Sequence, residues 1–414
     1  MAGTIYLDNH ATTRLDPRVL EVMLPWLTDQ YGNAGSSTHE MGRAARDAVE
    51  AARESFAAAI GAAPREIVFT SGATESTNIA LLGSAARARH TAERGVGPQP
   101  AGLARRHFVV SITDHHATLD PVEHLEREGF EVTRLPVVPQ TDAGGIPGRI
   151  RLADLRQAVR PDTLAVSILL ANNETGVVQD MAAVAEVAHD AGALVHVDCA
   201  QAVGRMPVDM DAIQADLASF SAHKFHGPKG VGGLFVRRRG RAVRVEPLVF
   251  GGGQERGMRS GTLDVPGIVG LAEAARLAGL ELAEEAPRMR RLRDLLWTRL
   301  AAGIVGLELN GPALDAVDSM GQPVRLVNNL NVHIPGVDGQ TLLAMLAGDG
   351  LAISSGSACS SENPRPSHVL MALGRDQDQA RASLRFGLSR FTSEAEIDDA
   401  ASLIGAGVAR LRSL

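Results

Sequence analysis

Cysteine is scarce in this chain, whose 414 residues include only Cys199 and Cys359. Two cysteines cannot build a disulfide framework, so we expect a reducing, cytoplasmic setting in which a thiol stays free to react. Aromatic residues make up 3% of the chain, and no apolar run reaches the ~18–20 residues needed to span a membrane. No basic segment followed by an apolar one stands at the N-terminus, so the sequence predicts no secretory signal.

Neither sign of charge dominates, because 41 Lys and Arg stand against 48 Asp and Glu, for a formal net charge of −7. Such a weakly acidic chain has no general attraction for nucleic acid or for an anionic membrane. Apolar residues make up 45% and charged residues 21%, as is typical of a globular protein. A chain of this length commonly divides into two domains, each with its own core.

Short apolar segments alternate with helical patterns, such as Met181–Gly192, through the first two-thirds of the chain. The expected strands are Glu66–Thr70, His107–Ile112, Leu164–Leu170, Leu194–Val197 and Leu217–Ser221. The alternation predicts an α/β domain with a mostly parallel sheet covered by helices. Candidate site residues are then expected at the carboxyl ends of its strands.

The pattern changes from about Val265. The elements expected after it are a long helix over Gly270–Ala302, short strands near Leu326–His333 and a final amphipathic helix over Ser393–Leu411. We therefore predict a large domain over residues 15–264 and a smaller domain made of residues 1–14 and 265–414.

A lysine and an aspartate give the first indication of chemistry. Lys224 lies in the run Phe220–Pro228, and Asp198 closes the apolar segment Ala193–Asp198, 26 positions upstream. A lysine at such a place can form a Schiff base with the aldehyde of pyridoxal 5'-phosphate (PLP), while a buried carboxylate keeps the pyridine nitrogen protonated. We therefore predict a PLP site at this edge of the sheet.

Cys359 lies in the loop Ser354-Ser-Gly-Ser-Ala-Cys-Ser-Ser361, whose residues are all small. A lone cysteine is usually a small buried apolar residue. Here the surrounding serines and glycine favour a polar loop that carries the thiol to a substrate. Cys199 follows Asp198 in an apolar segment, and we assign it to packing.

Other polar groups follow the predicted strands. The strand-to-helix turn Ser71–Glu75 offers N–H groups and a helix dipole to a phosphate, although many such turns are plain helix caps. Either His115 or His116 is placed to stack on a cofactor ring and to exchange protons. Asn172–Gly176 and Gln201 carry amides suited to a ring hydroxyl, but such groups are also ordinary in loops.

Two segments with arginine complete the set. Gly251–Thr262 is rich in Gly and Arg, which suits an anion, the docking of a second subunit near a phosphate, or a plain surface loop. Arg385 has the guanidinium needed to bind a carboxylate with two nitrogens. By spacing alone it also fits a surface strand.

In combination these motifs resemble the PLP-dependent cysteine desulfurases of the NifS/IscS type, in the class V aminotransferase family. The match runs from Tyr6–Thr13 to Arg385–Thr392, and the loop around Cys359 is similar to that of the first group of desulfurases. The resemblance implies PLP-dependent transferase fold type I. Its large domain has a mostly parallel seven-stranded sheet covered by helices, and its smaller α+β C-terminal domain carries the Cys359 loop.

The resemblance also implies roles for the site residues. Lys224 is the expected Schiff-base lysine, Asp198 the partner of the pyridine nitrogen, and His115 the residue that stacks on the ring and moves protons. The other expected cofactor ligands are Asn173 and Gln201 for the phenolic oxygen, Ala73, Thr74, Ser221 and His223 for the phosphate, and Thr262 from the second subunit of a homodimer. Arg385, with Asn173 nearby, is expected to hold the substrate carboxylate.

The implied reaction converts L-cysteine to L-alanine. Lys224 moves a proton from the substrate α-carbon, and the Cys359 thiolate then attacks the substrate sulfur and keeps it as a persulfide. A protein acceptor then takes the sulfur, for iron–sulfur clusters, a thio-cofactor or nucleic-acid thiolation. No metal, membrane or direct nucleic-acid contact is expected. The alternatives are selenocysteine lysis, an aminotransferase reaction and a partner-dependent sulfur-relay scaffold.

Two segments depart from the family. After Cys359 the chain reads Ser361-Glu-Asn-Pro-Arg-Pro-Ser367, with two prolines around an arginine, where the family is usually closer to Gly-x-Leu-Glu-Pro-Ser. Ala85–Arg106, rich in Ala, Arg, Gly and Pro, is expected to be a helix extension followed by a solvated loop, with contact to a partner as the alternative. Neither segment holds a residue matched to the cofactor site, so the expected activity is unaffected. The acceptor of the sulfur stays open.

Overall fold

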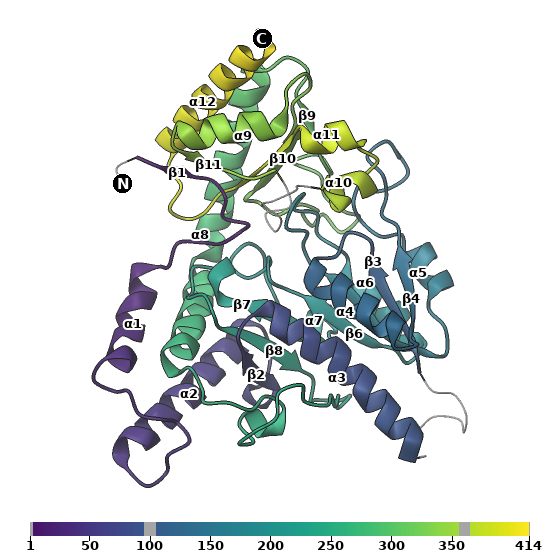
Figure 1. The fold of residues 1–414 in the computed structure, drawn as a ribbon, viewed down its shortest axis with the longest axis vertical. Coiled ribbons are helices and arrows are strands. Elements are labelled where there is room, and N and C mark those ends of the chain that lie inside the picture. The colour runs from purple at the N-terminus through teal and green to yellow at the C-terminus, as the bar shows by residue number, and fades with distance from the viewer. Residues whose placement is uncertain (1–2, 95–104, 356–364, 414) are drawn as a thin grey trace.

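The computed structural model describes residues 3–94, 105–355 and 365–413 (Figure 1). Its strands are β1 (Ile5–Tyr6), β2 (Ile67–Thr70), β3 (His107–Ser111), β4 (Glu131–Leu135), β5 (Thr163–Leu169), β6 (Leu194–Asp198), β7 (Leu217–Ser221), β8 (Gly232–Val236), β9 (Glu308–Leu309), β10 (Asn329–His333), β11 (Leu351–Ala352) and β12 (Ser383–Gly387). Its α-helices are α1 (Pro17–Leu27), α2 (Glu40–Ala59), α3 (Ala73–Arg94), α4 (His116–Arg127), α5 (Leu152–Ala158), α6 (Met181–Asp190), α7 (Met210–Ile213), α8 (Val265–Gly303), α9 (Gly339–Gly348), α10 (His368–Ala372), α11 (Gln377–Arg381) and α12 (Glu394–Arg412).

A seven-stranded sheet with the order β2-β8-β7-β6-β5-β3-β4 forms the centre of the larger part of the molecule. β8 pairs antiparallel with β2 and β7, while the other neighbouring strands run parallel. The residues of β3, β5 and β7 are buried throughout, because helices cover the sheet, and such strands read as continuous apolar runs. The predicted α/β fold with a mostly parallel seven-stranded sheet is confirmed.

The observed bounds differ from the predicted ones by small amounts. Each predicted strand of the large sheet matches within one residue at either end. Glu66 was predicted to open β2 but belongs to the 3-10 turn before it. There its carboxylate is buried and accepts hydrogen bonds from the backbone N–H groups of Ala63, Arg238 and Arg239. Two of these donors come from a distant segment, so the local sequence pattern alone cannot show that Glu66 lies outside the strand.

The N-terminal segment lies beside the C-terminal part of the chain. β1 pairs in parallel with β11, which places Ile5 opposite Leu351. Leu7 belongs to a second apolar core with residues of β10, β12 and α12. This core is separate from the one beneath the large sheet.

The long helix α8 connects the two cores (Figure 1). It begins at Val265, five residues before the predicted start, because the Asp264 side chain caps it by accepting a hydrogen bond from Gly267 N–H at 3.1 Å. Residues from Val265 to Ala278 pack in the core of the large sheet, whereas Leu292 to Leu300 pack in the second core. The first half of α8 therefore belongs to one core and its second half to the other. The predicted domain division at residue 264 stays a prediction.

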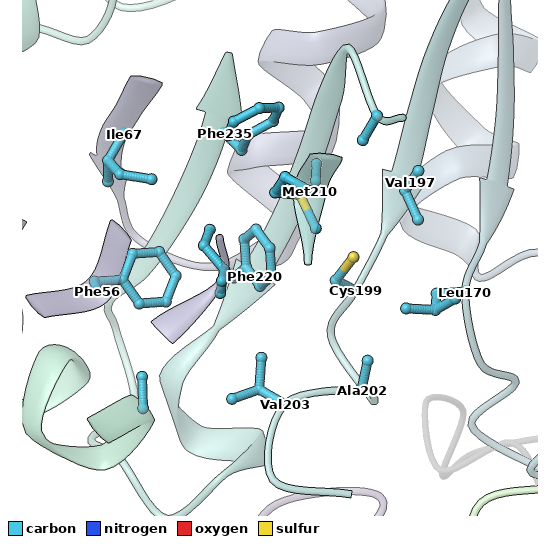
Figure 2. Packing of buried hydrophobic residues seen from close by; sticks show 14 of the residues in the cluster. Phe56, Ile67, Leu170, Val197, Cys199, Ala202, Val203, Met210, Phe220 and Phe235 are labelled. Atoms are coloured by element: carbon cyan, nitrogen blue, oxygen red, sulfur yellow. The ribbon is translucent and has the colours of Figure 1, made fainter. Parts of the chain in front are cut away.

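Cys199 is a packing residue, as predicted. Figure 2 shows its sulfur among apolar side chains, including those of Val197, Met210 and Phe220. Its exposed fraction is 1%, and burial raises the pKa of its thiol well above the usual value. A thiol in this environment is a poor nucleophile.

Two predicted features fall wholly or partly outside the described residues. Cys359 is one of them. The other is the stretch Ala85–Arg106, of which the structure describes the first part as helix: α3 continues to Arg94. That part of the stretch is the predicted helix extension.

Candidate active site

A cavity of about 550 Å³ opens at the carboxyl ends of the central strands. Parallel strands bring the residues that follow them to one edge of a sheet, which is where ligands bind in open α/β folds. Nine predicted site residues line the cavity: Ala73, Thr74, His115, Asn173, Asp198, Gln201, Ser221, His223 and Lys224. The structure thus gathers most of the predicted set from segments up to 151 positions apart in the sequence.

Lys224 ends a single 3-10 turn directly after β7. Its Nζ donates hydrogen bonds to the carbonyl oxygens of His10 at 2.7 Å and Ala11 at 2.8 Å. Burial, followed by the charges of Arg205 and Arg385, lowers the pKa of this amine to about 8. A lysine with such a pKa is partly neutral near physiological pH, as a nucleophilic amine must be.

Asp198 is the last residue of β6, the strand next to β7. One of its carboxylate oxygens, Oδ1, accepts a hydrogen bond from Ala200 N–H at 2.9 Å. Burial raises the pKa of this carboxyl group, while that hydrogen bond and the nearby His115 and Lys224 act in the opposite direction. A cationic group in the cavity would stabilise the ionised form of Asp198, as a protonated ring nitrogen does.

His115 is the N-cap residue of α4. Its Nδ1 accepts a hydrogen bond from Ala117 N–H at 3.0 Å, so the neutral ring carries its hydrogen on Nε2. Burial lowers the pKa of the imidazole, which favours this neutral form. His116 is exposed and its Nδ1 lies 3.0 Å from Asp120 Oδ1. Of the two candidate histidines, His115 is the one that lines the cavity.

The turn between β2 and α3 borders the same cavity. Gly72 lies here so close to β8 that a Cβ atom on Gly232 would be 2.5 Å from Gly72 Cα. Glu75 accepts a hydrogen bond from Ser71 N–H at 2.6 Å and another from Arg259 Nε at 2.8 Å, which ties the turn to the Gly251–Thr262 loop. The first N–H groups of a helix have no partner within it, so the start of α3 offers donors to an anion.

The last residue of β7, Ser221, and His223 in the turn after it line the cavity along with the turn between β2 and α3. A Cβ atom on Gly72 would lie 3.3 Å from Ser221 Oγ, so the hydroxyl is in contact range of the turn. His223 Nδ1 lies 3.1 Å from Thr12 Oγ1, and burial lowers the pKa of its imidazole to about 4. Ser221, His223 and the turn therefore supply neutral donors on one side of the cavity.

Two predicted site residues within the described ranges, Thr262 and Arg385, are not among the residues that line the cavity. Thr262 is exposed on its loop. Arg385, in β12, is 2% exposed, so the surface-strand alternative is wrong. Its guanidinium donates from Nη1 to Asn173 O at 3.0 Å and from Nη2 to Asp8 Oδ1 at 2.9 Å, which places it beside a lining residue. Cys359 lies outside the described residues.

Sequence reasoning missed three buried polar residues around the cavity: His10, Asp114 and Arg205. Asp114 accepts hydrogen bonds from the backbone N–H groups of Ser111 and Leu169, both at 2.8 Å, and burial raises the pKa of its carboxyl group to about 8. Asp114 and His10 lie inside motifs that had been singled out for other residues. The sequence does hold an indication that Arg205 is buried, because it is the one charged residue of the short and otherwise apolar segment Ala202–Met206.

Two other kinds of feature are absent from residues 3–94, 105–355 and 365–413. Within these ranges no group of three or more His, Cys, Asp or Glu side chains is placed to hold a metal ion. Over the same part of the chain, no helix has both the length and the apolar character to cross a membrane.

Comparisons of sequence place the chain among known proteins. The family model for class-V aminotransferases matches residues 5–399. A protein of Anaeromyxobacter dehalogenans (strain 2CP-C) named cysteine desulfurase IscS is 48% identical over 410 residues, which cover 99% of this chain and 94% of that protein. A protein of the same name from Klebsiella pneumoniae subsp. pneumoniae is 46% identical over 415 residues, with coverage of 99% and 94%.

Comparisons of structure agree with this result. A NifS-like protein superposes with a TM-score of 0.84 at 37% identity, covering 99% of this chain and all of the other. DndA from Streptomyces lividans superposes with a TM-score of 0.72 at 40% identity, covering 91% and 97%. The family predicted from the sequence is confirmed. The chain belongs to the class-V aminotransferase family, and within it to the cysteine desulfurases of the IscS/NifS type.

Proposed function

We propose that the chain is a PLP-dependent cysteine desulfurase, which converts L-cysteine to L-alanine and holds the sulfur as a persulfide on Cys359. One observation carries the proposal. Lys224 and Asp198, at the ends of adjacent strands, share a cavity with the helix start of Ser71–Glu75. An amine of lowered pKa, a buried carboxyl group and an anion site are what the aldehyde, ring nitrogen and phosphate of PLP require.

The chemistry of the lining residues fits PLP. Its phosphate would accept hydrogen bonds from the backbone of Ala73 and Thr74 and from the side chains of Ser221 and His223, where neutral donors gather. Asp198 would face the ring nitrogen. When bound, PLP supplies an electron sink that stabilises negative charge at the substrate α-carbon.

The remaining work falls to side chains of the chain itself. Lys224 would take the proton from the substrate α-carbon, because its lowered pKa leaves the Nζ amine partly neutral. His115 presents Nε2–H to the cavity, since Nδ1 is held by Ala117 N–H. Arg385 binds the substrate carboxylate, in competition with Asp8, to which its Nη2 now donates.

The flanks of the Cys359 loop are attached next to the cavity. At the start of the loop, Ser354 and Arg385 bond through their backbones, with Arg385 N–H donating to Ser354 O at 2.7 Å. After it, Ser367 caps α10 and its hydroxyl donates to the buried Glu174, the neighbour of Asn173. These anchors support a role for Cys359 as the sulfur acceptor at this cavity.

We propose further that the chain forms a homodimer in which Thr262 reaches the partner's phosphate site. Thr262 is exposed and does not line the cavity of its own chain. Near the start of the same loop the apolar side chain of Phe250 is 80% exposed, which favours its burial by a second subunit. A cytoplasmic location and a protein acceptor for the sulfur stay predictions, as does the choice between iron–sulfur cluster assembly and another thiolation pathway.

The test is mass spectrometry of the purified protein after brief exposure to L-cysteine, with alanine measured in parallel. One added sulfur on Cys359, with an equal amount of alanine, is expected. The Cys359→Ala variant serves as the control and should gain no sulfur. An unmodified Cys359 alongside turnover to 3-mercaptopyruvate, the keto acid that transamination of L-cysteine gives, would instead identify an aminotransferase. No turnover without a partner protein would favour the sulfur-relay alternative.

A further inference from the structure

Arg205 is buried behind Lys224 and contacts three segments of the site. Its exposed fraction is 6%. Nη2 donates to the carbonyl oxygens of Lys224 at 2.9 Å and Asn9 at 3.0 Å. Nη1 donates to both the backbone and the side-chain oxygen of Gln201. One guanidinium therefore joins the turn after β7, the loop after β6 and the N-terminal segment.

The charge of Arg205 has no acidic partner within the described part of the chain. Burial, with the nearby Arg385, lowers the pKa of its guanidinium to about 9. Burying a cation without a counter-ion is costly, so its full set of carbonyl and amide acceptors must offset much of that cost. One of these acceptors is the carbonyl oxygen of Lys224 itself, so this buried charge acts directly on the site.

We propose that Arg205 is a positioning residue, which holds Lys224 against the His10–Ala11 backbone and orients the Gln201 amide so that its Nε2 group donates into the cavity. The proposal rests on the proposed function, because it assigns these contacts to the binding of PLP. Nothing in the spacing of the motifs pointed to this role.

The first part of the argument concerns Gln201. A guanidinium only donates hydrogen bonds, so the atom of Gln201 that faces Arg205 must be Oε1. The Gln201 Nε2 group then donates one hydrogen to His10 O at 2.9 Å. Its second hydrogen is left for the cavity that Gln201 lines, where it can donate to a phenolate oxygen.

The orientation of His10 follows from the same arginine. Gln201 Oε1 can only accept, so His10 Nδ1, 3.1 Å away, must carry a hydrogen. His10 Nε2 then accepts from Asn329 Nδ2 at 3.2 Å, and the ring stays neutral because burial lowers its pKa well below the usual value. The carbonyl oxygen of this fixed residue is one of the two acceptors of Lys224 Nζ.

The second part concerns the charge around Lys224. Four charged groups act on its amine: Arg205 and Arg385 favour the neutral form, while Asp198 and Asp8 favour the cation. Arg385 is paired with Asp8, whereas Arg205 is unpaired within the described residues. Loss of Arg205 should therefore leave Lys224 more fully protonated as well as less well held.

The test uses the full-length apoprotein with Arg205→Met and Arg205→Lys, and Arg293→Met as a matched control. Arg293 is also buried, but it donates to the carbonyl oxygens of Leu314 and Leu326 and to the carboxylate of Asp294, away from Lys224. Competitive acetylation of Lys224 against pH, followed by peptide mass spectrometry, gives the midpoint of its titration. A second measurement gives the dissociation constant of PLP, and circular dichroism shows whether each variant is folded.

Arg205→Met should raise the Lys224 midpoint by about one unit and weaken PLP binding about five- to tenfold. Arg205→Lys should keep the midpoint, because the charge remains, but still weaken PLP binding, because an ammonium cannot make the four contacts. In a Gln201→Leu background, Arg205→Lys should weaken PLP binding less, since the two residues then no longer act on each other.

Folded Arg205→Met with the midpoint and PLP affinity of the Arg293→Met control would overturn the proposal. If Arg205→Met does not fold, Arg205→Lys and the Gln201→Leu cycle decide, and additive effects on PLP affinity would overturn it equally. Failure of the proposed function is seen separately, as the absence of a borohydride-trapped PLP adduct on Lys224 in the unaltered chain. The acetylation midpoint tests Arg205 even then, because it needs no cofactor.

Discussion

The substitution Glu255→Gln should strongly destabilise the protein, because Glu255 is half of a buried ion pair. Its carboxylate accepts hydrogen bonds from Arg53 Nη1 at 2.8 Å, Arg53 Nη2 at 2.7 Å and Phe69 N–H at 2.7 Å. The side chains of Arg53 and Glu255 are 4% and 1% exposed. This pair fastens the Gly251–Thr262 loop to β2, beside the proposed phosphate site.

The expected loss in the free energy of unfolding follows from the charge of Arg53, which stays buried when an amide replaces the Glu255 carboxylate. Removing one partner of a buried ion pair costs about 3–5 kcal/mol, because the other charge stays buried. Two terms reduce that cost here. Arg53 keeps a contact with Glu50 at 3.2 Å, and the side-chain oxygen of the introduced glutamine can still accept a hydrogen bond from Arg53 or from Phe69 N–H. We therefore expect a loss of about 3 kcal/mol, the lower end of that range.

Urea unfolding of the apoprotein, monitored by circular dichroism, measures the change in the free energy of unfolding. Glu50→Gln is the matched control, because it removes a carboxylate from the same arginine at a site whose side chain is 56% exposed. That control should cost no more than about 0.5 kcal/mol. Equal losses in the two variants would refute the reasoning, since burial would then make no difference to the value of the contact.

Three further predictions concern catalysis. Cys359→Ala should keep the absorbance of bound PLP but lose sulfide release, and normal release in a sulfide assay would contradict the persulfide step. The apoprotein should capture PLP faster as the pH rises through about 8, because the neutral amine of Lys224 is the nucleophile and its pKa is about 8; a flat stopped-flow rate profile across that pH would exclude this amine. Arg385→Lys should raise KM for L-cysteine about tenfold, with a smaller change in kcat, because lysine keeps the charge but loses the two-nitrogen contact. Steady-state kinetics on L-cysteine check this, and an unchanged KM would remove Arg385 from substrate binding.

Where the chemistry is local, the sequence was sufficient. Lys224 and Asp198 follow apolar segments that form neighbouring buried strands, so the edge of the sheet they share could be predicted from strand order and alternation. His115 needed more, because two adjacent histidines look alike in sequence. The structure separates them since the N-cap position turns His115 inward and leaves His116 exposed.

The supports of the site were decided by the tertiary structure alone. β1 pairs with β11, although most of the chain separates them in the sequence, and this pairing brings Asp8 to Arg385. Arg205 meets Lys224 only because the loop after β6 folds back beneath the turn after β7. The role of a buried charged residue depends on its burial and on partners far away in the sequence, and neither can be predicted from the neighbouring residues. The sequence by itself therefore determined the family and predicted the cofactor and the reacting residues, while contacts between distant segments decided which side chains hold the predicted residues in place.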